Sequence, residues 1–243
     1  MGRFYPLGLP RAEMLAYYAE RFPVVEVNST YYRTPPPRVM EQMERKTPPR
    51  FRFLVKAPRT LTHERRLDPE TVEGFRACLD PLRTASKLEG VLLQFPWSFK
   101  PGAGAWRLLA GARRALPDLP LFAEFLHADW AEPATFARLR EGGLGYCIVD
   151  EPPLAGLMPP RVELTSPIGY VRFHGRNTAN WWGRGGGDRY DYLYSDTELR
   201  EWVAKIHDLA ARAEKVYVFF NNCHAGQAAR NAALMQQLLL AGG

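Results

Sequence analysis

The sequence predicts an α/β fold in which parallel strands alternate with helices. Short segments rich in β-branched and apolar residues alternate with amphipathic segments along the whole chain, which requires helical crossovers between parallel strands. Seven strands can be recognised, which fits an open doubly wound sheet, whereas a complete (β/α)8 barrel has eight. The 243 residues, 46% of them hydrophobic, suit one domain of about this size, so we predict a single domain over residues 1–243.

The first half of the chain begins with a helix. Met14, Leu15, Tyr18 and Phe22 follow helical spacing, so we expect a helix over 10–22. We then expect a strand over 24–28, a helix over 38–46, a strand over 51–56 stopped by Pro58, a polar connection over 59–70, a helix from Pro69 to about Lys87, and a strand over 89–94.

The second half repeats this order. We expect a helix over 104–116, a strand ending at Glu124, a helix over 133–140, a strand over 145–150, a strand over 170–175, a helix over 196–213, a strand over 215–220 and a closing helix over 225–241. Ser195 and Glu198 have the spacing of a capping box. No GxGxxG motif follows a strand, which argues against a dinucleotide-binding fold.

Polar side chains stand where the predicted strands end. Arg172 and His174 lie two residues apart, so both should face the same side of their strand, opposite Val171 and Phe173. Charged groups are costly to bury unless they neutralise one another, and active sites of parallel α/β folds lie at the carboxyl ends of the strands. We therefore predict that these side chains converge on one site: Glu26, Asn28, Lys56, Gln94, Glu124, Asp150, Arg172, His174, Asn221 and Asn222.

The positive charge of the chain is local. The formal net charge is +6, and the segment 45–66 alone holds eight basic residues against one acid, Glu64. Such a concentration suits an anionic ligand, a phosphate or a nucleic acid, but a solvated basic face is the simpler interpretation.

Cysteines and apolar runs carry little functional signal. Cys78, Cys147 and Cys223 are odd in number and lack CxxC spacing, so we expect small buried hydrophobic residues rather than disulfides or a zinc site. No apolar run is long enough to span a membrane and the N-terminus lacks a signal peptide's apolar core, so we expect a cytoplasmic protein with no membrane partner.

Seven collinear motifs between Phe4 and Met235 carry a family resemblance: VEVNSTYY, FRFLVKAPRTLTH, KLEGVLLQFP, AEFLHADW, YVRFHG, RYDYLYSDTELREW and VYVFFNNCHAGQAARNA. Together they resemble the YecE-like family, domain of unknown function 72. The resemblance implies a TIM-type (β/α)8 barrel. It also places His63, His127 and Tyr194 among the expected ligand-binding residues.

Two positions depart from that family. Its members usually open with a strand similar to GTSGW before the Phe-Tyr-Pro that is Phe4–Pro6 here, so we expect a barrel without its first strand. The family pattern ExRH is Glu124-Phe125-Leu126-His127 in this chain, so Leu126 replaces an arginine that the resemblance implies as an anion contact.

The residue types suggest roles. Glu26, Glu124 and Asp150 are candidates for general acid or base, Lys56 and Arg172 for holding an anion, and His174 for proton transfer near neutral pH. Asn28, Gln94 and Asn221 would orient hydroxyls or carbonyls, and the helix after Asn222 would receive a phosphate at its N-terminus.

Two further sites have alternative interpretations. We expect no cofactor, although Glu26, Glu124, Asp150 and His174 are of the right types for a divalent metal. Trp181 and Trp182 could close over a sugar or a base, or pack their loop against the barrel.

Three functions stay open. The first is an enzyme, a hydrolase, lyase or isomerase, that uses acid and base chemistry on a small phosphorylated or polyhydroxylated compound. The second is a nucleic-acid-binding barrel or nuclease that uses the segment 45–66. The third is a ligand-binding barrel without catalysis.

Overall fold

The computed structural model describes residues 4–183, 188–222 and 224–242, and these divide into two compact units. The first unit comprises residues 1–96 and 101–123, and the second comprises 97–100 and 124–243. The prediction of a single domain stays a prediction, and the two units are described separately.

The strands of the first unit are, in chain order, β1 (Val24–Val27), β2 (Arg52–Lys56), β3 (Leu88–Gln94) and β4 (Leu121–Glu124) up to Ala123, and the last residue of β4, Glu124, belongs to the second unit. The pairs β1–β2 and β2–β3 are parallel, with Val25 opposite Phe53 and Val55 opposite Val91. The helices of this unit are α1 (Met14–Ala19), α2 (Pro37–Arg45), α3 (Arg59–Thr62), α4 (Pro69–Thr84) and α5 (Ala103–Ala115), with short 3-10 turns at Arg11–Glu13 and Ser29–Tyr31.

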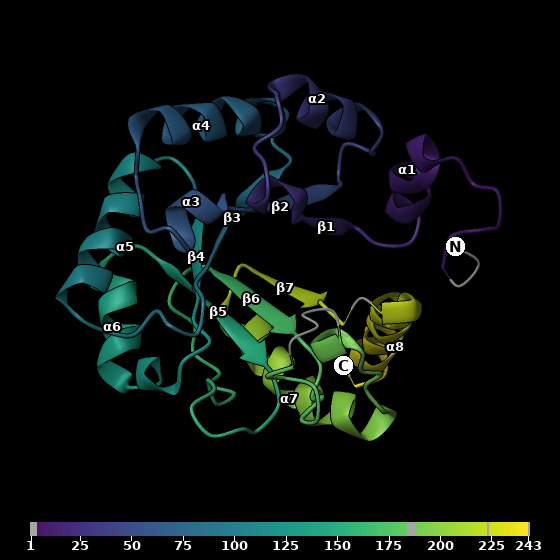
Figure 1. Ribbon diagram of the computed structural model, residues 1–243. Coiled ribbons are helices and arrows are strands. Elements are labelled where there is room, and N and C mark those ends of the chain that lie inside the picture. The colour runs from purple at the N-terminus through teal and green to yellow at the C-terminus, as the bar shows by residue number, and fades with distance from the viewer. Residues whose placement is uncertain (1–3, 184–187, 223, 243) are drawn as a thin grey trace. The chain divides into compact units, whose positions relative to one another are not determined.

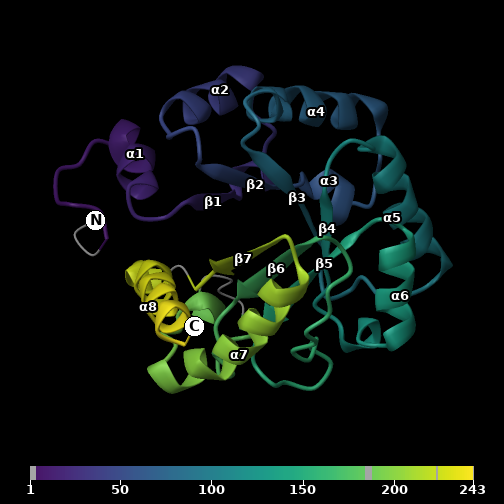
Figure 2. The same cartoon turned by 180° about the vertical axis from the view of Figure 1, so that it is seen from behind.

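The core of the first unit lies between its strands and α4. Phe53, Leu54 and Val55 of β2 are fully buried, and α4 buries Phe75 and Leu82 on one stripe. Helices α2 and α4 pack side by side (Figures 1 and 2). Burial on both faces of β2 is typical of a parallel strand that is covered by helices.

Two predictions for this unit are wrong. The helix expected over 10–22 is shorter, a 3-10 turn followed by α1, and ends at Ala19 because Pro23 disfavours helical backbone at Phe22. The connection expected over 59–70 contains the short helix α3, which begins directly after Pro58. Its first turn follows from the fixed backbone of that proline.

The second unit has strands β5 (Gly145–Asp150), β6 (Ile168–Phe173) and β7 (Lys215–Phe220), adjacent in that order and parallel. Its helices are α6 (Pro133–Glu141), α7 (Asp196–Arg212) and α8 (Gln227–Ala241), with 3-10 turns at Ala128–Trp130, Asp188–Tyr190 and His224–Gly226. Helices α7 and α8 lie beside each other and against β7 (Figure 1). The predicted capping box of Ser195 and Glu198 is confirmed at the start of α7.

Strand β6 separates two chemical environments in this unit. Phe173 packs against Trp202 of α7 and Phe220 of β7, with ring centroids 5.1 and 4.6 Å away. Arg172 and His174 point to the opposite side, as strand alternation predicts. The polar site therefore lies on the side of β6 that faces away from α7.

Within the described residues we find seven strands, and none of the helices there is long and apolar enough to cross a lipid bilayer.

Candidate functional site

A buried ionic cluster of the second unit joins Glu124 to Arg172 and His174. Arg172 Nη1 donates to Glu124 Oε2 at 2.5 Å, and His174 Nε2 lies 3.1 Å from Glu124 Oε1. All three side chains are at most 1% exposed. Burial by itself would raise the pKa of Glu124, but the charge of Arg172 and the hydrogen bonds from Arg172 and His174 outweigh it and hold that pKa below its usual range.

The second ring nitrogen of His174 extends the cluster to β7. Nδ1 lies 3.2 Å from the amide nitrogen of Asn221, which follows the last residue of β7. Because an amide nitrogen can only donate, Nδ1 accepts and the ring proton sits on Nε2, from which it is donated to Glu124. Glu124 and Asn221 thus fix both the orientation and the tautomer of His174.

Cys147 of β5 adds a thiol to the same cluster. Its Sγ lies 3.6 Å from Glu124 Oε2. Cys147 and Cys78 are buried, as predicted, whereas Cys223 lies outside the described residues. The contact with Glu124 could not be predicted from spacing, because 23 residues separate the two.

Sequence reasoning missed a second buried carboxyl, Glu151. Its Oε1 accepts the Met158 backbone N–H at 3.0 Å, and its Oε2 is buried without a hydrogen-bond partner among the described residues. Burial raises the pKa of Glu151 well above its usual range, and the negative charges of Glu124 and Asp150 raise it further. Glu151 is therefore protonated at pH values where Glu124 is ionised.

Asp150 faces the other side of the sheet. It pairs in register with Phe173, and Trp202 Nε1 donates to its Oδ2 at 2.8 Å, so its carboxylate lies toward α7. The expectation that Asp150 shares a centre with Arg172 and His174 is therefore wrong. The physical reason is strand alternation, because the residue in register with Arg172 is Val149.

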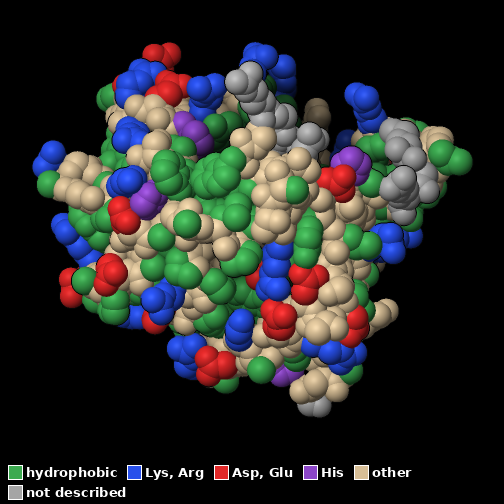
Figure 3. Space-filling model, turned by 60° about the horizontal axis from the view of Figure 1, so that its bottom comes forward, with side chains coloured by type: hydrophobic (Ala, Val, Ile, Leu, Met, Phe, Trp, Pro, Cys, Tyr) green, Lys and Arg blue, Asp and Glu red, His purple; other side chains and the backbone are tan. Residues whose placement is uncertain are grey.

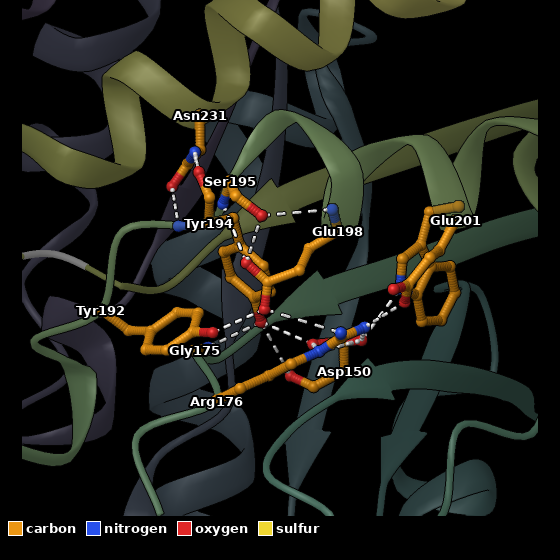
Figure 4. Close-up of polar contacts among 10 residues, drawn as sticks. Asp150, Gly175, Arg176, Tyr192, Tyr194, Ser195, Glu198, Glu201 and Asn231 are labelled. Carbon is orange, nitrogen blue, oxygen red and sulfur yellow. Dashed lines mark hydrogen bonds and ion pairs between the residues drawn. The ribbon is translucent and has the colours of Figure 1, made fainter.

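Asp150 is instead the centre of a network that holds the loop after β6 (Figure 4). Arg176 Nε donates to Asp150 Oδ1 at 2.9 Å, and Arg176 Nη2 donates to Asp150 Oδ2 at 2.7 Å and to Glu201 Oε2 at 3.0 Å. Hydrogen bonding to Asp150 is the main cause that raises the pKa of Arg176. Arg176 was not a predicted site residue, although it lies just two positions after His174.

Tyr194 and Asn222 belong to the same framework. Tyr194 OH donates to Asp150 Oδ1 at 2.7 Å and accepts the Gly175 N–H at 2.9 Å. The Asn222 amide nitrogen donates to Tyr192 O at 2.7 Å and to Asn231 Oδ1 at 2.8 Å. Tyr194 is 2% exposed and Asn222 is fully buried, so both predicted ligand-binding residues hold the loop in place.

Gly175 is the position in that loop where the backbone leaves no room for a side chain. Its φ is +93°, and a Cβ at this position would lie 2.8 Å from Tyr192 Cβ. Only glycine meets both conditions without strain. The Gly175–Tyr194 hydrogen bond thus fixes the backbone immediately after His174.

The first unit holds its own polar groups after its strands. Asn28 Nδ2 donates to Glu26 Oε1 at 2.8 Å, just beyond β1. Lys56 Nζ lies 4.4 Å from the Tyr31 ring centroid, and the His63 ring lies 4.9 Å from that of Tyr31. Burial, followed by the charge of Lys56, lowers the pKa of His63 to about 4. Gln94 is buried at the end of β3.

The predicted site residues therefore fall into two groups, one in each unit. Glu124, Arg172, His174 and Asn221 come together in the second unit. The expectation that they share one centre with Glu26, Asn28, Lys56, His63 and Gln94 stays a prediction.

His127, which is buried, and Trp182 both lie against Trp97 in the second unit. The ring centroid of Trp97 is 4.7 Å from that of His127 and 5.6 Å from that of Trp182. Trp182 is 55% exposed, whereas Trp181 is buried. Trp97 was not a predicted site residue, although it follows the strand-ending Gln94 by three positions.

The basic segment 45–66 is less positive in its surroundings than in its sequence. Arg45 pairs with Glu41, Arg52 with Glu89, and Arg66 with Glu64 and Asp68. Three of these four acids lie outside the segment and reduce its local charge. The face shown in Figure 3 carries basic and acidic side chains interspersed.

The metal alternative gains no support from side-chain geometry. Across the parts of the chain that the structure describes, no group of three or more His, Cys, Asp or Glu side chains could hold a metal ion. Asp150, one of its four ligands, faces away from Arg172 and His174.

Comparison with known proteins places the fold and the family. The chain is similar to a solved DUF72 family protein from Thermotoga maritima, with 40% identity, a TM-score of 0.91, and coverage of 99% of this chain and 94% of that one. The chain is also similar to a solved xylose isomerase domain containing protein from Salmonella typhimurium, with 14% identity, a TM-score of 0.55, and coverage of 96% of this chain and 93% of the Salmonella protein. At this identity the likeness shows the fold alone, which is a TIM-type α/β fold. The predicted fold class is therefore confirmed.

Sequence comparison agrees with the structural likeness. The chain is 32% identical over 252 residues to UPF0759 protein YunF of Bacillus subtilis, which covers 97% of this chain and 89% of YunF. The family model described as "Protein of unknown function DUF72" matches residues 1–242. The resemblance to the YecE-like family is thus confirmed, and the chain belongs to the DUF72 family.

Proposed function

We propose that this chain is an enzyme that performs acid and base chemistry on a small phosphorylated or polyhydroxylated compound, with Glu151 as the proton donor. The observation that carries the proposal is the buried Oε2 of Glu151, which has no hydrogen-bond partner in the described part of the chain, on a carboxyl whose pKa the charge of Glu124 raises further. A buried polar atom without a partner costs about 1–3 kcal/mol, so its retention suggests a partner that arrives with the substrate.

The opposite pKa shifts of Glu124 and Glu151 support separate roles. Enzymes that use two carboxyls at one pH place them in environments that drive their pKa values apart. Glu124 keeps its negative charge and orients His174, whereas Glu151 keeps its proton. Glu151 then protonates a leaving or carbonyl oxygen, and His174 Nδ1, once its contact with Asn221 opens, accepts a proton.

Arg172 gives the site its cationic component. It neutralises Glu124 and leaves the centre able to accept negative charge that develops on a substrate. This supports phosphorylated and polyhydroxylated compounds over cationic ones.

A turnover screen tests the proposal. Sugar phosphates, sugar acids and polyols are incubated with the wild-type chain and with Glu151→Gln, which keeps the shape but has no proton to donate. We expect turnover of at least one compound and a loss of about 100-fold or more in Glu151→Gln. The matched control is Glu214→Gln at an exposed position, which should keep the wild-type rate.

Titration of the carboxyls tests, without any substrate, whether the pKa of Glu151 is raised. Carbon-13 NMR of labelled glutamates should show one carboxyl that titrates well above the usual range and that disappears in Glu151→Gln. If Glu151 titrates like an exposed glutamate, or if Glu151→Gln leaves turnover unchanged, the proposal is wrong.

A further inference from the structure

Two exposed tryptophans of the second unit lie next to each other. These are Trp97 and Trp182, and together with Lys100 and with His127, which is only 6% exposed, they form a group of four residues that we call the Trp97 platform. Trp97 is 38% exposed and Trp182 is 55% exposed, and their ring centroids are 5.6 Å apart at an interplanar angle of 77°. Large exposed aromatic side chains are uncommon on free surfaces and are enriched at binding sites.

The Trp97 ring is held in place by a hydrogen bond to the backbone of Gly156. Its Nε1 donates to the Gly156 carbonyl at 2.9 Å, and the same carbonyl accepts the Ala128 N–H at 3.1 Å. Gly156 has φ +81°, and a Cβ there would lie 3.5 Å from Trp97 Cζ2. Glycine therefore suits this backbone conformation, and a Cβ there would be in ordinary van der Waals contact with the indole. A ring that is already held loses little conformational entropy when a ligand stacks on it.

Polar groups flank the aromatic rings. His127 Nδ1 accepts the Asp129 N–H at 3.1 Å, which leaves the ring proton on Nε2. The Asp129 carboxylate also lies next to this ring, with Oδ2 3.4 Å from Nδ1. Lys100 Nζ lies 5.4 Å from the Trp97 ring centroid and adds a positive charge. One N–H donor and one cation thus stand beside an apolar surface, with the Asp129 carboxylate on the Nδ1 side of His127.

We propose that the Trp97 platform binds a sugar ring that carries an acidic group. This proposal rests on the proposed function, because such a sugar would be the substrate of the enzyme. The apolar face of a sugar packs on a tryptophan, its hydroxyls accept from His127, and its carboxylate or phosphate pairs with Lys100. The nearly perpendicular arrangement of Trp97 and Trp182 offers no parallel slot for a planar base between them.

The platform is joined to Glu151 by a short segment of backbone. His127 forms a β-bridge with Leu157, and the Met158 N–H donates both to Leu126 O at 3.0 Å and to Glu151 Oε1 at 3.0 Å. The segment 156–158 therefore supports Trp97 and Glu151 together. A sugar on the platform would be held by the scaffold that positions the proposed proton donor.

Direct binding of defined compounds tests this proposal. Isothermal titration calorimetry of the full chain is run with glucuronate, glucose 6-phosphate, glucose, inorganic phosphate and adenosine monophosphate. We expect the two acidic sugars to bind more tightly than glucose or phosphate. Trp97→Ala should weaken their binding by about tenfold or more, and Trp97→Phe, which retains an aromatic face, by less.

Lysine variants test the charge. Lys100→Met should weaken the acidic sugars about threefold and leave glucose unchanged. Lys205→Met is the matched control, because Lys205 Nζ also lies over a tryptophan, 4.6 Å from the Trp202 ring on α7, and it should change nothing. Circular dichroism checks that each variant is folded.

Three results would overturn the proposal: no binding of either acidic sugar at millimolar concentration, equal binding by folded Trp97→Ala, or tighter binding of adenosine monophosphate than of glucose 6-phosphate. Glu151→Gln separates this inference from the proposed function. If Glu151→Gln still binds the acidic sugars and neither it nor the wild type turns over any compound, the platform proposal is supported and the proposed enzymatic function is wrong. If the wild type shows turnover but its binding does not depend on Trp97, the enzymatic function is supported and the platform proposal is wrong.

Discussion

Glu124 and Glu151 are two buried glutamates of the same unit, and they differ in what their oxygens contact. Glu124 has an arginine on one oxygen and a histidine on the other. Glu151 has one backbone N–H on Oε1 and no hydrogen bond on Oε2 within the described part of the chain. Their pKa values consequently move in opposite directions from the usual range.

This difference shows that burial alone does not determine the state of a carboxyl. Both groups lose water, which favours the neutral form. Glu124 gains a direct ion pair with Arg172 that reverses the effect, whereas the charge of Arg189 offsets it only in part at Glu151. The charge of Glu124 then adds to the rise in the pKa of Glu151. The two carboxyls form a coupled pair, and each prediction below changes one side of it.

The largest effect is expected from Glu124→Gln. The substitution leaves Arg172, which is 1% exposed, without its counter-charge. Leaving one charge of a buried pair uncompensated costs about 3–5 kcal/mol, so we expect the free energy of unfolding to fall by about that much in urea titrations.

A double variant provides the control for this prediction. Glu124→Leu with Arg172→Met removes both charges, and an apolar replacement of a buried pair is often neutral, so most of the stability should return. An equal loss in the single and double variants would show that shape rather than charge holds the site.

A smaller effect is expected from Asp150→Asn on the opposite face of β6. The change weakens the two contacts from Arg176 and leaves the contacts from Tyr194 and Trp202 with a neutral partner. We expect a loss of about 2 kcal/mol, because hydrogen bonds to charged groups contribute about 1.5–3 kcal/mol. Urea unfolding measures it, and unchanged carbon-13 titration of Glu124 would confirm that the two faces are separate.

The pH dependence of stability distinguishes the two glutamates next. Folding raises the pKa of Glu151. The contribution of Glu151 to the free energy of unfolding is therefore fully present below its unfolded-state pKa of about 4.3 and is lost as the pH rises through its folded-state pKa. Glu124 has the opposite sign, because its contribution is present above that pKa and is lost as pH falls through its lower folded value.

Glu151→Gln isolates the Glu151 contribution. We expect the variant to remove the fall in stability above about pH 4.3, where each unit of pKa shift corresponds to about 1.4 kcal/mol. Thermal unfolding of both chains from pH 4 to 8 measures this. Parallel curves for wild type and variant would contradict it.

Much of the fold could be predicted from sequence because local patterns set it. Helix α7 begins where the Ser195 and Glu198 capping box indicates, and the strands ending at Gln94, Glu124 and Asp150 end at those residues. Alternation also placed Arg172 and His174 on one face, since that needs only two positions in the same strand.

The site was harder to predict because it depends on register between strands. Only the pairing of Val149 with Arg172 and of Asp150 with Phe173 shows that Asp150 faces away from the Arg172 side of the sheet. Arg176 and Trp97 were missed for a related reason. Their partners Asp150, Glu201 and Gly156 lie 25 to 59 positions away, beyond the reach of sequence spacing.

The smallest effect is expected from Glu201→Gln, which removes an exposed partner of Arg176. Glu201 is 48% exposed, and Arg176 keeps its two contacts with Asp150. Surface ion pairs contribute about 0–1 kcal/mol and are screened by salt, so we expect a loss below about 1 kcal/mol that vanishes in 1 M sodium chloride. Urea unfolding at low and high salt measures it. A loss as large as that of Asp150→Asn would mean that Glu201, rather than the buried carboxylate, holds the loop after His174, and the contrast between buried and exposed partners would fail.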